Sequence, residues 1–178
     1  MLQKIKGERT LKPYIRYKIE DAGIEVNVDE KLTSEDYVGI KVDDYYAGLH
    51  EAIIPKAVDF AIVVDCSCST YVLYLLELKN VNSPKHLIIS DIHEKFKNTI
   101  SDFLSDRFKE IFMNDKYKYE DIKLYLVSDA YSEGGKYKDY EQYKKCVSKI
   151  YGRDTLKVDH NLGGQLFRFR NRVLKIEY

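Results

Sequence analysis

The chain has 178 residues, of which 44% are hydrophobic and 33% charged, and its 29 basic and 29 acidic residues give a formal net charge of zero. This composition is typical of a globular domain with its own core and excludes an intrinsically disordered chain. A zero net charge argues against a protein that coats nucleic acid by charge alone. The longest apolar run is too short to span a bilayer, so we expect no membrane partner.

Cysteine content and the amino-terminal residues indicate the compartment. The three cysteines are an odd number, and they lack the spacing of a zinc site. The first residues, MLQKIKGERTLK, are basic and lack the apolar segment of a signal peptide. We therefore expect reduced thiols and a cytoplasmic protein.

The first part of the chain predicts a hairpin and a short helix. Tyr14 to Ile19 and Ile24 to Val28 alternate apolar and polar residues around Asp21-Ala22-Gly23, which is typical of an edge β-hairpin. Asp43 to Ile53 has the pattern of a short helix, which Pro55 would end. We find no repeat or Pro/Gly-rich linker, and we expect a single domain over residues 1–178.

The segment from Lys56 to Asn80 predicts two strands, Val58 to Asp65 and Tyr71 to Asn80, joined by a small polar loop. Three charged residues lie in these apolar runs: Asp59, Glu77 and Lys79. An isolated buried charge costs several kcal/mol, so such residues usually have a partner or a task.

Folding the chain at the loop predicts that Asp59 lies across from Glu77. Strand side chains alternate between faces, and directly paired side chains lie about 5 Å apart. A divalent cation with oxygen ligands at about 2.1 to 2.5 Å can bridge two such carboxylates. Asp65 lies at the loop end of the same strand, so we rank it below Asp59. The competing interpretation is a buried salt bridge with Lys79, which would leave the second carboxylate without a cation.

The rest of the chain predicts a long amphipathic helix, followed by a strand at Ile122 to Val127 that can run parallel to the second strand of the hairpin. Tyr140 to Ile150 has the pattern of another helix, and Gln165 to Ile176 that of one or two closing strands. The predicted fold class is α/β, with a mixed β-sheet flanked by helices.

Asp59 and the sequence Glu77-Leu78-Lys79, on a hairpin followed by a helix and a strand, resemble the PD-(D/E)xK nuclease superfamily. The resemblance covers residues of about 46 to 128 and implies a restriction-endonuclease-like core of the order αβββαβ. The N-terminal hairpin and the C-terminal helix and strands would be additions to it. Val58 stands where the family often has proline directly before the aspartate.

The resemblance implies a Mg²⁺-dependent endonuclease that hydrolyses DNA, with Mn²⁺ as a substitute metal. Asp59, Glu77 and the backbone carbonyl of Leu78 would bind the metal, and Lys79 would position or deprotonate the attacking water. Glu51 lies where the family often carries a further glutamate, although an ordinary exposed helix charge explains it equally well. Many such enzymes dimerise, so we expect a homodimer.

Nucleic-acid contacts are predicted at two places. Lys97 is early in the long helix, where the superfamily often places a polar residue near the phosphate, although for this residue taken singly a solvated helix face is the favoured interpretation. Arg168, Arg170 and Arg172 alternate with other residues and would line one face of a strand as a phosphate-contacting stripe. A charged, protected sheet edge is the competing interpretation of these arginines.

Two other functions remain open. The first is a ribonuclease or nuclease toxin on the same core. The second is a non-catalytic module with a nuclease-like fold that binds nucleic acid or protein.

Overall fold

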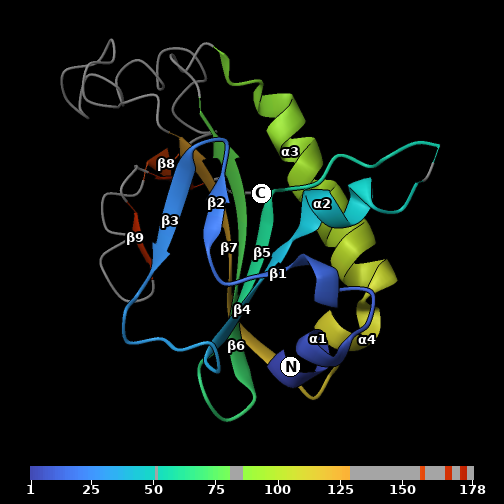
Figure 1. Ribbon diagram of the computed structural model, residues 1–178, viewed down its shortest axis with the longest axis vertical. Helices are drawn as coiled ribbons and strands as arrows, with labels where there is room; N and C mark the ends of the chain where they lie inside the picture. Colours follow the sequence, from blue (N-terminus) through green and yellow to red (C-terminus); the bar gives the residue numbers. More distant parts are fainter. Residues whose placement is uncertain (51, 81–85, 129–156, 159–166, 170–172, 176–178) are drawn as a thin grey trace. The chain divides into compact units, whose positions relative to one another are not determined.

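The computed structural model (Figure 1) describes residues 1–50, 52–80, 86–128, 157–158, 167–169 and 173–175. By their contacts the residues divide into two compact units. Unit 1 consists of Met1–Tyr17, Glu30–Leu76 and Ile89–Lys123, and unit 2 of Lys18–Asp29, Glu77–Ile88 and Leu124–Tyr178. The expectation of a single domain stays a prediction.

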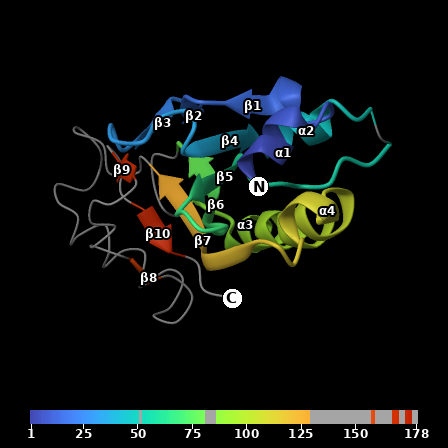
Figure 2. The same ribbon diagram turned by 90° about the horizontal axis from the view of Figure 1, so that it is seen from below.

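The strands of unit 1 form a mixed sheet, as predicted. They follow one another in the order β1-β4-β5-β6-β7, which Figure 2 shows. Their bounds are Ile15–Arg16 (β1), Tyr37–Lys41 (β4), Phe60–Asp65 (β5), Thr70–Lys79 (β6) and Lys118–Ser128 (β7). The last residues of β6 and of β7 are counted in unit 2. The pairs β1–β4, β4–β5 and β5–β6 are antiparallel. The N–H of Lys118 donates to the carbonyl of Ser69 at 3.0 Å, so β6 and β7 begin at the same end and run parallel.

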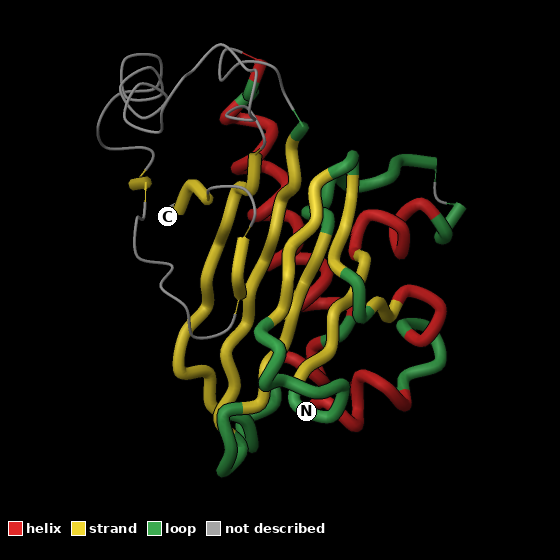
Figure 3. The backbone as a smooth tube through the Cα atoms, turned by 60° about the vertical axis from the view of Figure 1, so that its left-hand side comes forward, coloured by secondary structure: helices red, strands yellow, loops and turns green. Residues whose placement is uncertain are grey.

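A long helical segment lies on one face of this sheet, behind the strands in Figure 3. It consists of the α-helix α3 (Ile89–Asn98), the π-helix η3 (Thr99–Arg107) and the short helix α4 (Lys109–Phe112). Its apolar residues recur at helical spacing and are buried, which confirms the predicted amphipathic helix. They are Ile92, Phe96, Phe103, Leu104, Phe108, Ile111 and Phe112.

Shorter helices complete unit 1. Helix α1 (Leu2–Gly7) contacts β4 and β5, and a single 3₁₀ turn, η1 (Lys12–Tyr14), leads into β1. Helix α2 (Val42–Ala47) follows β4 directly and contacts β5. Among the residues that the structure describes, no helix combines the length and the apolar character that crossing a membrane would need.

Unit 2 contains the predicted N-terminal hairpin. Strands β2 (Ile19–Asp21) and β3 (Ile24–Val28) pair antiparallel, and β9 (Phe167–Phe169) pairs with β3. The two turn residues, Ala22 and Gly23, have φ of 49° and 79°, as the two-residue hairpin turn that matches strand twist requires. Strand β10 (Val173–Lys175) pairs with the end of β7 and with β8 (Lys157–Val158).

Several predicted boundaries differ from the structure. The short helix ends at Ala47 and not at Ile53. Strand β4 (Tyr37–Lys41) was not predicted. Because β4 precedes α2, only β5 and β6 lie between α2 and α3, and the order αβββαβ is not reproduced there. The helix predicted at Tyr140 to Ile150 falls outside the described residues.

Candidate functional site

Asp59 lies immediately before β5 and not within it, because that strand begins at Phe60. The prediction that the strand starts at Val58 is therefore wrong. The N–H of Val58 donates to the hydroxyl oxygen of Thr99 at 3.1 Å, and the carbonyl of Asp59 accepts from the N–H of Val42 at 2.9 Å. A helix side chain and the first residue of α2 thus hold this segment on both sides.

Asp59 is buried, with 4% of the residue's surface exposed, and a lysine lies beside it. Lys41 is also buried, with 7% of its surface exposed. Its Nζ atom lies 3.9 Å from Oδ1 of Asp59 and 2.9 Å from Oδ2 of Asp43. The same ammonium lies 4.9 Å from the centre of the Phe60 ring, within the range of a cation–π contact. Lys41 is therefore a single cation shared by a buried and a half-buried carboxylate.

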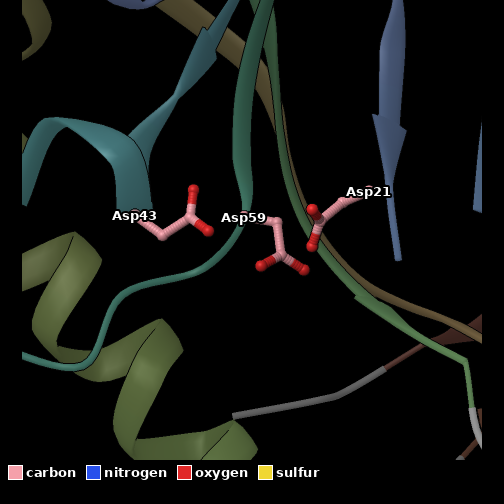
Figure 4. A group of neighbouring side chains, drawn as sticks. All are labelled: Asp21, Asp43 and Asp59. Atoms are coloured by element: carbon pink, nitrogen blue, oxygen red, sulfur yellow. The ribbon is translucent and has the colours of Figure 1, made fainter. Parts of the chain in front are cut away.

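The carboxylates of Asp43 and Asp59 are close enough to share a cation. Figure 4 shows Asp43 at the start of α2 and Asp59 on the segment before β5, and a carboxylate oxygen of each lies within 4.8 Å of the other. The third carboxylate in Figure 4, Asp21, ends β2 and belongs to unit 2. Carboxylate oxygens are hard donors of the kind that Mg²⁺ and Ca²⁺ prefer.

Glu77, Leu78 and Lys79 form the last three residues of β6. Glu77 is completely buried, and its Oε1 accepts from the Lys79 ammonium at 2.9 Å. The Lys79 side chain is 38% exposed, so its charge lies at the boundary between the buried carboxylate and solvent. Alternation along the strand places Glu77 and Lys79 on one face and Leu78, which is 2% exposed, on the other.

The register of β5 and β6 is the one that the sequence predicts. Phe60 pairs with Leu76 at one end of the ladder, and Asp65 pairs with Tyr71 at the loop end. Asp59 and Glu77 are the chain neighbours of the Phe60–Leu76 pair, one on each strand. Asp65 lies at the opposite end, which supports ranking it below Asp59.

Each of the two carboxylates has a lysine of its own, with Lys41 beside Asp59 and Lys79 beside Glu77. The prediction that an ion pair with Lys79 would leave the second carboxylate without a cation is therefore wrong. The signal for Lys41 was present: like Lys79, it ends an apolar run, here Tyr37-Val38-Gly39-Ile40. No local pattern indicates Thr99, because its hydroxyl contacts Val58 only in the folded chain.

The other predicted residues are spread over the chain. Lys97 is exposed on α3, and Arg168 lies in β9 at the position paired with Asn27. Glu51, Arg170 and Arg172 fall outside the described residues, so the expected arginine stripe stays a prediction.

Comparisons with protein-family models, with curated proteins and with solved structures find no match to this chain. The resemblance to PD-(D/E)xK nucleases therefore stays a prediction from the sequence.

Proposed function

We propose that the protein is a Mg²⁺-dependent endonuclease that hydrolyses the phosphodiester bonds of DNA. The observation that carries this proposal is the position of two buried carboxylates at one end of the β5–β6 ladder. Asp59 is 4% and Glu77 0% exposed, and each is bonded to a member of the terminal pair Phe60–Leu76. A parallel strand, β7, follows after the long helical segment, as the proposed core requires.

The donor set fits a hard divalent cation. Asp59 and Glu77 offer carboxylate oxygens and Leu78 a backbone carbonyl, and oxygen ligands of these kinds are those that Mg²⁺ takes in proteins. When bound, the metal would stabilise negative charge on the scissile phosphate. Mn²⁺ accepts the same ligands and is expected to replace it.

Lys79 would position the attacking water or a phosphate oxygen. A lysine held in an ion pair carries three N–H donors and no acceptor, so it can orient these groups but cannot take a proton from them. Its partial exposure lets the ammonium reach a substrate while Glu77 holds it at 2.9 Å. The water oxygen would bond to phosphorus as the bond to the leaving sugar oxygen breaks, with one water proton passing to bulk solvent and the leaving oxygen taking a proton from solvent.

A non-catalytic interaction module is the alternative that a specific observation favours. Each buried carboxylate has a lysine ammonium within 4.0 Å, so each is buried next to a cation that the protein itself supplies. Buried ion pairs of this kind also occur where no chemistry takes place. The two functions differ in whether nucleic acid is cleaved.

A cleavage assay on plasmid DNA distinguishes the endonuclease from the interaction module. The purified chain is expected to nick or cut plasmid DNA with Mg²⁺, and Asp59→Asn, Glu77→Gln and Lys79→Met are each expected to lower the rate by about 100-fold or more. Asp65→Asn is the matched control, because it removes a carboxylate from the other end of β5. Circular dichroism during heating would check that each variant folds.

Other outcomes would redirect the assignment. Cleavage of RNA alone would favour a ribonuclease or nuclease toxin. Binding of nucleic acid without cleavage in either Mg²⁺ or Mn²⁺ would favour the interaction module. Gel filtration with light scattering would test the expected homodimer.

A further inference from the structure

Lys41 is a buried lysine that the proposed reaction does not use. It ends β4, opposite Phe60 in the ladder with β5, and its side chain is shielded from solvent. Burying a lysine removes its ammonium from water, which is unfavourable unless nearby charges compensate. Here two carboxylates and an aromatic ring compensate: Asp43 at 2.9 Å, Asp59 at 3.9 Å and the centre of the Phe60 ring at 4.9 Å.

The Lys41 ammonium therefore acts as a counter-ion to the Asp59 carboxylate. We propose that Lys41 competes with the divalent metal: in the metal-free protein its ammonium pairs with both Asp43 and Asp59, and it withdraws from Asp59 when the metal binds. This inference rests on the proposed function, because it takes Asp59 as a metal ligand. It assigns Lys41 a positioning role that sets the metal concentration at which the site fills.

The geometry favours withdrawal from Asp59 in particular. The contact with Asp43 is 1.0 Å shorter than the contact with Asp59, since the two distances are 2.9 Å and 3.9 Å. Asp43 is also the more exposed of the two carboxylates, with 37% of its side chain exposed against 5% for Asp59. The ammonium can thus keep its shorter ion pair while a metal binds to Asp59.

The test measures the affinity for Mn²⁺, by calorimetry or by the loss of the free-ion electron-spin signal. Lys41→Met removes the competing charge but keeps an unbranched side chain, and it is expected to bind Mn²⁺ at least about tenfold more tightly than the natural protein. Lys123→Met is the matched control, because Lys123 also contacts one carboxylate, Asp121, and one ring, Tyr74. That variant is expected to keep the natural affinity.

A second measurement needs no variant and applies even if Lys41→Met fails to fold. The natural protein is acetylated with an amine-reactive ester, with and without Mn²⁺, and each lysine is quantified by mass spectrometry. Lys41 is expected to react several-fold faster when the metal is bound, and Lys123 equally fast in both samples.

The outcomes distinguish the two proposals. If Lys41→Met and the natural protein bind Mn²⁺ equally well, or if Lys41 reacts no faster with saturating metal, the competition is overturned and the proposed function stands. Weaker binding by Lys41→Met also overturns it. If neither protein binds Mn²⁺, both proposals are wrong.

Discussion

At the scale of single residues, the position of Asp59 depends on hydrogen bonds outside the sheet. Thr99 is completely buried in the π-helix η3, donates to the carbonyl of Lys95 at 2.8 Å and accepts from the N–H of Val58 at 3.1 Å. Asn98 donates to the carbonyl of Lys56 at 3.2 Å. The segment that leads to Asp59 is therefore attached to the helix at two consecutive helix residues.

Replacing Thr99 with valine tests this attachment. Valine has nearly the same shape but no hydroxyl, so the buried N–H of Val58 would lose its acceptor. We expect the free energy of unfolding to fall by about 1 to 3 kcal/mol. Thr99→Ser keeps the oxygen and should lose less, which a comparison of urea unfolding curves would show. No loss in Thr99→Val would mean that the hydroxyl contributes nothing, and a larger loss in Thr99→Ser than in Thr99→Val would mean that the packing of the Thr99 methyl group matters more than the hydrogen bond.

The candidate site could be predicted from sequence where a charge interrupts an apolar run. Asp59, Glu77 and Lys79 met that condition, and the carboxylates of Asp59 and Glu77 are buried in the structure. Lys41 met the same condition at the end of an apolar run but was overlooked, whereas Thr99 was missed because its importance comes from a contact with a residue distant in the sequence. A threonine in a helical pattern looks like any other surface residue until its neighbours are known.

At the scale of elements, the loop between β5 and β6 adopts an uncommon backbone conformation. Ser67, Cys68 and Ser69 have φ of 76°, 52° and 60°, in the left-handed region that favours glycine. The loop is closed by the N–H of Cys66, which donates to the carbonyl of Thr70 at 2.9 Å. The hairpin thus keeps its register although no glycine is present in the loop.

Glycine at this loop is expected to stabilise the protein. A residue with a side chain costs about 1 to 2 kcal/mol in the left-handed conformation, and Cys68 is exposed, so its side chain contributes little packing. We expect Cys68→Gly to raise the free energy of unfolding by up to about 1 kcal/mol, after the entropy of glycine in the unfolded chain is subtracted. Cys66→Gly, at a residue without positive φ, should lower it. Urea midpoints that shift in the same direction for both variants would contradict this account.

Elements were predictable where their pattern is long. The β5–β6 hairpin and the long helix have extended apolar patterns, and both are present in the structure. Strand β4 was missed because it is short and buried along its whole length, so it shows no alternation. The π-helix was missed because its apolar spacing is close to that of an α-helix. Its signature is backbone hydrogen bonds between residues five apart, such as the one that the N–H of Phe108 donates to the carbonyl of Phe103 at 3.1 Å.

At the scale of the whole molecule, the fold class followed from the order of elements. Two apolar strands, a long helix and a third strand predict a mixed sheet with helices packed on it, and unit 1 has this arrangement. The pairing of β9 with β3 and of β10 with β7 did not follow, because the partners are distant in the sequence. Nothing in a short strand specifies which distant edge it joins.

A property of the folded chain is its sensitivity to alkali, because burial raises the pKa of four tyrosines in the part of the chain that the structure describes. For Tyr37, Tyr71 and Tyr119 the main cause is loss of solvation. Burial also dominates for Tyr46, and its hydroxyl in addition donates to Asp102 at 2.8 Å, which favours the protonated form and raises the pKa further.

These shifts predict alkaline unfolding. A tyrosine in the unfolded chain ionises near pH 10, whereas the four folded tyrosines keep their protons to higher pH. The stabilisation is complete below about pH 10 and is lost as pH rises towards the folded pKa, by about 1.4 kcal/mol per pH unit for each tyrosine ionised only in the unfolded state. Urea unfolding at a series of pH values above 9 would measure the slope. Tyr46→Phe removes one of these tyrosines and should make that slope shallower by about 1.4 kcal/mol per pH unit. An unchanged slope would mean that Tyr46 ionises at the same pH in the folded protein as in the unfolded chain.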